Sequence, residues 1–117
     1  MEIIFFWEGD GGSREPNCRS DVLSDEGVDL LACVLTDHGG QGYGSTIGWL
    51  DEGLSRVELV KRGAVESSDW SRECWGVGLS GETARIYSLY DEDYFSNMSI
   101  DDFEKALLGW KRFILAG

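Results

Sequence analysis

The sequence predicts a single α+β domain over residues 1–117, with an antiparallel sheet of about four to six strands and a long C-terminal helix packed on one face. Three observations predict this fold. The chain is about the length of one domain. Its last third combines a hairpin pattern with a strongly amphipathic helix pattern. Hydrophobic residues make up 42% of the chain and aromatics 12%, which is enough for a packed core.

The C-terminal helix is the best-marked element of the sequence. Ser99 is the expected N-cap, and Asp102 three residues later completes a capping-box pattern. Met98 and Phe103 flank this cap as a hydrophobic staple. The residues that recur at helical spacing and form one apolar stripe are Ile100, Phe103, Ala106, Leu107, Trp110, Phe113 and Ile114.

The N-terminal third predicts one strand followed by irregular chain. Residues 3–7 are apolar on both faces, which is typical of a strand inside a sheet. A turn follows at residues 9–13, and the only proline, Pro16, lies in the next loop. Residues 20–27 are acidic, and we expect them to be exposed.

Three middle segments are harder to assign. Residues 28–36 fit a helix capped by Ser24 or a buried strand, and the strand is the preferred interpretation. Residues 45–54 fit either a short helix or a strand, because Gly48 and Gly53 argue against a long element. Residues 56–61 alternate between polar and apolar, which predicts a strand with one wet face.

The chain then returns to a clear pattern. Residues 64–70 are expected to be a polar connection in which Trp70 is exposed. Alternation in residues 75–79 and a turn at residues 80–82 predict a hairpin over residues 73–90.

Charge restricts the class of partner. The chain has 22 acidic and 10 basic residues, for a net charge of −12. Nucleic acid and anionic membranes would be repelled, whereas a basic partner would be attracted. Three cysteines without metal-binding spacing predict reduced thiols, with Cys33 and Cys74 buried. No signal-peptide or membrane-spanning pattern is found, so we expect a cytoplasmic protein.

The sharpest candidate site is an acidic elbow between the hairpin and the helix. Its members are Tyr90, Asp91, Glu92, Asp93 and Tyr94. The spacing does not match a calcium loop, and an acid/base pair would need neighbours that separate two carboxylate pKa values. A solvated loop remains an alternative. Exposed carboxylates beside tyrosines suit a contact surface for Lys and Arg of a partner.

Secondary acidic patches at predicted turns would extend this surface if they lie at the same end of the sheet. They consist of Glu8, Asp10, Asp51 and Glu52. A glycine-rich loop at residues 39–44 lacks the phosphate-binding patterns, so no cofactor is expected. His38 has no nucleophile or second ligand at motif spacing, so neither catalysis nor a metal site is expected.

Several segments together resemble small bacterial immunity proteins of polymorphic toxins, including those of contact-dependent growth inhibition. The segments that carry the resemblance are Tyr43-Gly44-Ser45, Trp49-Leu50, Trp70-Ser71-Arg72-Glu73, Trp75-Gly76, residues 86–92, Phe103 and Trp110. The resemblance implies a non-enzymatic protein that binds and neutralises one toxin domain, often a nuclease. Two alternatives are an acidic mimic of nucleic acid with a broader range, and a small enzyme that uses His38 or the carboxylates of residues 91–93.

Overall fold

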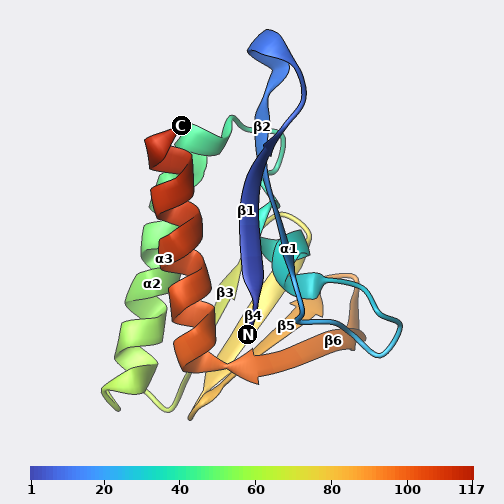
Figure 1. Ribbon diagram of the computed structural model, residues 1–117. Helices are drawn as coiled ribbons and strands as arrows, with labels where there is room; N and C mark the ends of the chain where they lie inside the picture. Colours follow the sequence, from blue (N-terminus) through green and yellow to red (C-terminus); the bar gives the residue numbers. More distant parts are fainter.

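The computed structural model describes the backbone of all 117 residues and every side chain except that of Ser13. The expected α+β class is confirmed, with two antiparallel sheets and three α-helices around one core (Figure 1). The two-stranded sheet consists of β1 (Ile3–Glu8) and β2 (Glu15–Ser20). The four-stranded sheet contains, in spatial order, β3 (Ser67–Ser71), β4 (Trp75–Ser80), β5 (Thr83–Ser88) and β6 (Asp91–Ser99). The helices are α1 (Leu30–Leu35), α2 (Ile47–Lys61) and α3 (Ile100–Ala116), with short 3-10 turns at Gly11–Ser13 and Tyr43–Thr46.

Helix α3 begins and packs as the sequence predicts. The Ser99 hydroxyl accepts a hydrogen bond from the backbone N–H of Asp102 at 3.1 Å, which confirms the N-cap. The helix lies side by side with α2 and contacts strands of both sheets (Figure 1). Trp110 and Phe103 are fully buried on its inner face. Burial of this apolar stripe therefore links the two sheets, as does α1, which contacts β2, β4 and β5.

The N-terminal strand does not lie inside the large sheet, so this prediction was wrong. Strand β1 pairs only with β2, and the expected loop around Pro16 is the second strand of this hairpin. Phe5 stacks on Phe113 of α3 and lies tilted against Trp110, whereas Ile4 on the other face is 59% exposed. One apolar face of β1 therefore packs on helix α3, and the other is directed toward solvent.

Residues 28–36 form helix α1 and not the preferred strand. Asp29 supplies the cap, because its Oδ1 accepts a hydrogen bond from the backbone N–H of Ala32 at 3.0 Å. The same carboxylate receives both the N–H and the hydroxyl of Ser20 at 2.6 Å. The cap therefore also fastens the helix to the end of β2, which is a tertiary contact that periodicity could not show.

Helix α2 (Ile47–Lys61) follows the 3-10 turn at Tyr43–Thr46 without a break, so the strand predicted at residues 56–61 was wrong. Val57 and Val60 are buried at helical spacing. Gly53 lies inside the helix and does not end it. The indole of Trp70 packs directly on its backbone. A Cβ at this position would come within 2.9 Å of that ring.

Trp70 itself is buried and belongs to β3, so two further predictions, an exposed Trp70 and a polar connection, were wrong. The indole is 4% exposed and donates a hydrogen bond to the carbonyl of Trp49 at 3.0 Å. The hairpin over residues 73–90 is confirmed as β4 and β5, with Trp75 opposite Ser88. The elbow is not a loop: Asp91 begins strand β6, and a register shift at Tyr87 and Ser88 interrupts its pairing with β5.

The cysteines carry no disulfide, as expected for reduced thiols. The buried thiol is that of Cys18, whereas Cys33 and Cys74 are only half-buried, which corrects the assignment made from sequence. Burial raises the pKa of Cys18 to about 12. Its thiol is therefore protonated and unreactive near neutral pH.

Two glycines of α2 form a matched pair for testing the contact between this helix and the sheet. Replacing Gly53 with Ala should destabilise the protein by about 1–3 kcal/mol, because the added methyl group meets the Trp70 ring. Replacing Gly48 with Ala should be neutral or stabilising by up to about 1 kcal/mol, because its Cβ would meet no atom within 4 Å. Urea unfolding of both variants measures the difference. Equal effects would contradict the packing described here.

Ion pairs join α2 to α3 near both ends. The Lys61 ammonium lies 2.7 Å from Asp101 and 3.0 Å from Glu104, and Lys111 lies 2.5 Å from Asp51. Hydrogen bonds with Asp101 and Glu104 raise the pKa of Lys61, and the hydrogen bond with Lys61 lowers the pKa of Asp101. All these groups remain accessible to solvent, so their contribution to stability is small and sensitive to salt.

The Lys61 pairs make stability depend on pH in a defined direction. Stabilisation through Asp101 is present above its ordinary pKa of 3.8 and is lost as the pH falls through the lowered value. Stabilisation through Lys61 is present below its ordinary pKa of 10.5 and is lost as the pH rises through the raised value. The Lys61→Met variant should therefore melt lower than wild type between these limits, and the difference should shrink in acid. Lys105→Met removes the same charge from a residue that forms no ion pair in the described part and acts on Asp101 only through a weaker charge interaction, so its melting temperature should fall less than that of Lys61→Met.

Candidate protein-binding surface

The acidic segment is held by hydrogen bonds at the turn end of the β5–β6 hairpin. The hydroxyl of Ser88 accepts from the N–H of Tyr90, and Oδ1 of Asp91 accepts from the N–H of Asp93, both at 3.1 Å. Arg85 donates from Nη2 to the carbonyl of Glu92 at 2.6 Å. These contacts order the backbone of the turn.

The side chains of this segment point mainly to solvent. Tyr90 is 81% exposed, the highest value among the large hydrophobic side chains. Asp91, Glu92 and Asp93 are exposed, and none of them forms an ion pair within the described residues. The carboxylates are thus not neutralised by Lys or Arg side chains of the described residues. The segment therefore combines a free aromatic ring with free negative charge.

Tyr94 differs from Tyr90 in its surroundings. Its ring is half-buried and lies 6.0 Å from the ring of Trp75. Tyr94 therefore packs within the protein, and Tyr90 is the tyrosine available as an anchor for a partner.

The other acidic candidates do not join this segment. Asp51 and Glu52 lie at the start of α2, where they pair with Lys111 and with Arg56. Glu8 accepts a hydrogen bond from Asn17 at 2.7 Å, and Asp10 lies at the tip of the β1–β2 hairpin. In Figure 1 this tip and the start of α2 lie at the top, far from the start of β6 at the lower right. The structure therefore separates the nine candidates into three places.

His38 has a local role in the glycine-rich loop. Its Nδ1 accepts a hydrogen bond from the N–H of Gly40 at 3.0 Å, and its ring lies edge-on to Tyr43 at 4.7 Å. Gly39 and Gly40 have φ of +59° and +80°, a conformation that favours glycine. These glycines therefore serve a tight turn. No group of three or more metal-ligating side chains occurs among the described residues.

Arg72 is an unusual buried group to which the sequence interpretation gave no role. It is 6% exposed and lies 5.2 Å from the ring of Trp49 and 5.5 Å from that of Trp70. Nη1 donates to the carbonyl of Val34 at 3.2 Å, whereas Nε and Nη2 have no partner among the described residues. Burial lowers its pKa to about 10, partly opposed by Asp37 and Tyr43. The guanidinium therefore connects α1, α2 and β3 inside the protein.

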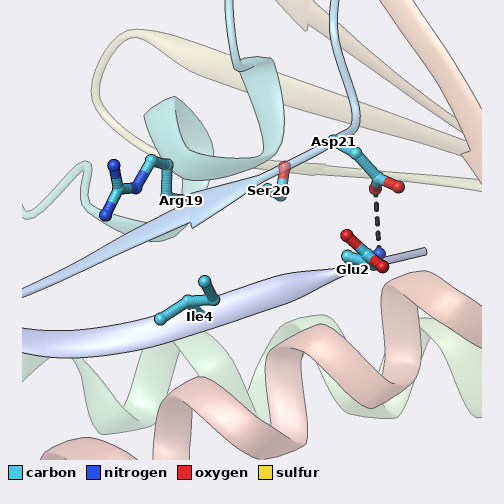
Figure 2. Close-up of a pocket in the computed structure, with 5 residues that line it drawn as sticks. All are labelled: Glu2, Ile4, Arg19, Ser20 and Asp21. Carbon is cyan, nitrogen blue, oxygen red and sulfur yellow. Dashed lines mark hydrogen bonds between the residues drawn. The ribbon is translucent and has the colours of Figure 1, made fainter.

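A small surface depression lies at the open end of the β1–β2 hairpin (Figure 2). Ile4 and Arg19 lie beside each other on adjacent strands, and the N–H of Glu2 donates to Asp21 at 3.0 Å. Its volume of about 170 Å³ is below the range typical of ligand pockets. Nothing in its lining indicates a ligand.

Comparisons with protein families, curated proteins and solved structures find no match to this chain. Among the described residues, no helix has both the length and the apolar composition needed to cross a membrane. Function must therefore be inferred from the surface of the chain itself.

Arg72 permits a test that separates volume from charge. Replacing Arg72 with Ala should destabilise the protein by about 2–4 kcal/mol, because it leaves a space between two tryptophan rings. Replacing it with Met should restore most of this loss, because Met fills the space and removes a buried charge with two unpaired N–H groups. Chemical denaturation of both variants measures the two effects. An equal loss in both would indicate that the guanidinium charge itself is required.

Proposed function

We propose that this protein is a non-enzymatic inhibitor, an immunity protein that binds and neutralises one bacterial toxin domain with a basic surface. The observation that carries the proposal is the ordered segment of residues 90–93, where three exposed carboxylates without ion pairs follow an exposed tyrosine. Aromatic anchors beside orienting charges are typical of protein interfaces. The resemblance to immunity proteins described above agrees with this class.

The net charge of the protein supports a basic target, and we propose that this target is a nuclease toxin. A domain that grips nucleic acid carries a basic cleft. A net charge of −12 would attract such a domain from a distance and accelerate the encounter. Tyr90 would then anchor the complex by burying its ring at the centre of the contact. Rapid association would protect the producing cell before the toxin acts.

The test is a charge reversal at the hairpin end, measured against the toxin domain encoded directly upstream of this gene. The Asp91→Lys/Asp93→Lys variant should associate at least about tenfold more slowly at low salt, because steering of this kind changes association rates by one to three orders of magnitude. The matched control is Glu15→Lys/Glu58→Lys, which changes the net charge equally at two exposed positions on β2 and α2. Stopped-flow association and calorimetry measure rate and affinity.

The outcomes distinguish the proposal from its alternatives. Equal slowing in both variants would assign the effect to net charge alone and would contradict a localised site. Inhibition of several unrelated nucleases would favour a general mimic of nucleic acid. Loss of protection in a folded His38→Ala variant, with toxin binding intact, would favour an enzyme. Absence of a toxin gene upstream, or of any binding to its product, would overturn the proposal.

A further inference from the structure

The outer face of the four-stranded sheet has no covering element. All three helices contact the sheet from the side on which Trp70, Val77 and Ile86 are buried. The residues that alternate with them face the other way and form cross-strand rows. One such row is Asp69, Gly78, Arg85 and Asn97, in the order β3 to β6. Asp69 and Asn97 are exposed and the other two are half-buried, so this face is open to solvent.

Two glycines in the central strand β4 have different surroundings on this face. At Gly76 the ring of Tyr87 lies against the backbone, and a Cβ would come within 2.6 Å of it. At Gly78 a Cβ would meet only Oδ1 of Asp69, at an ordinary contact distance of 3.4 Å. Packing within the chain therefore requires glycine at 76 but not at 78. Glycine inside a strand often marks a bulge, a tight bend or the close approach of a ligand or another backbone. The pairing of β4 with β3 and β5 has no register shift at Gly78, which argues against a bulge and favours close approach.

Gly78 forms the floor of an open groove of about 310 Å³ across the strands. Its lining includes Asp69, Thr83, Arg85 and Asn97. The aromatic rings of Tyr87 and Phe95 lie in the neighbouring row, where Phe95 is 39% exposed. Aromatic and Arg side chains around an open, flat region are the composition of protein contact sites.

The groove is lined by two charged residues, Arg85 and Asp69, and only Arg85 has its charged group engaged within the protein. Arg85 is already engaged, because it donates to the Glu92 carbonyl and its guanidinium lies 4.2 Å from the centroid of the Phe95 ring. The carboxylate of Asp69 accepts no hydrogen bond and forms no ion pair within the described residues. Burial and the negative charges of Asp69 and Glu92 raise the pKa of Tyr87. Arg56 also reaches Asp69, but it donates to the backbone carbonyl at 2.7 Å, so the Asp69 carboxylate remains available to a cation from another molecule.

We infer that this face binds an extended basic segment of a protein partner, with one Lys or Arg side chain crossing Gly78 to reach Asp69. The inference rests on the proposed function for the identity of the partner, and it adds a second contact next to the acidic segment. The two surfaces are continuous, because Arg85 on the sheet face holds the backbone of Glu92. A second copy of this chain is a poor occupant, since each copy has a net charge of −12.

A peptide titration tests the groove without any toxin. The probe is a capped hexapeptide of alternating Thr and Lys, added to the ¹⁵N-labelled protein at low salt. Shift changes should centre on the amides of Gly78, Arg85 and Asn97, and should fall at least about fivefold in Asp69→Asn, which removes one charge without changing shape. They should persist in Glu58→Gln, which removes the same charge from α2. Changes centred on residues 90–93, or unchanged by Asp69→Asn, would overturn the inference.

Binding to the upstream toxin domain separates this inference from the proposed function. Gly78→Val should fill the groove and weaken the complex at least about tenfold, the loss expected when a central contact is blocked. Gly78→Ala is the milder substitution if Val disturbs the fold, which near-UV circular dichroism would reveal. Wild-type affinity in both folded variants, with loss in Asp91→Lys/Asp93→Lys, would leave the proposed function intact and refute the groove. If the wild-type protein binds no toxin domain, the proposed function fails and the peptide titration decides on the groove alone.

Discussion

Aromatic rings from the two sheets lie directly on glycines of the two long helices, and this contact sets the spacing of the whole core. Trp70 of β3 lies on Gly53 of α2, and Phe5 of β1 lies on Gly109 of α3, where an added Cβ would come within 2.9 Å and 2.8 Å of the rings. A methyl group at either position would push a helix away from its sheet, and close-packed interiors do not absorb such a shift easily. Helices α2 and α3 also contact each other and are joined by ion pairs. A shift of either helix would therefore disturb both ring contacts.

This arrangement places all packing on one side of the four-stranded sheet. Helix α3 buries Phe103 toward the large sheet and Trp110 toward the hairpin β1–β2, so both sheets share one core. The buried Arg72 fits the same pattern, since its flat guanidinium fills the space between Trp49 and Trp70. The opposite face of the sheet contributes little to the core. A substitution such as Asp69→Asn on that face should therefore have little effect on folding.

The sequence allowed correct prediction of those elements whose signals are local. The Ser99 cap, the α3 stripe and the β4–β5 hairpin all lie within short stretches of chain, so pattern and capping residues suffice. Helix α2 and strand β3 were misassigned together, because Gly53 lowers helix propensity and Trp70 lies in a polar run. Gly53 and Trp70 contact each other across the core, so neither element could be assigned from its own stretch of sequence. Exposure of the acidic segment followed from composition, but the separation of Glu8 and Asp51 from it depends on tertiary structure. The groove at Gly78 depends on strand register, which no local pattern encodes.

The ion pairs found among the described residues all involve the two long helices. Bases on α2 and α3 neutralise acids on those helices: Lys61 and Lys111 each bridge the two, and Arg56 pairs with Glu52. At the hairpin end and on the outer sheet face, Asp69, Asp91 and Asp93 have no such partner within the described residues. These three carboxylates are thus unpaired while the chain as a whole has a net charge of −12, so both the local charge and the overall charge favour a cationic partner. In the complex that we propose, a basic partner would bind the face of the sheet that no helix covers. Docking there would bury the partner against a backbone that is already ordered, which reduces the entropy lost on binding.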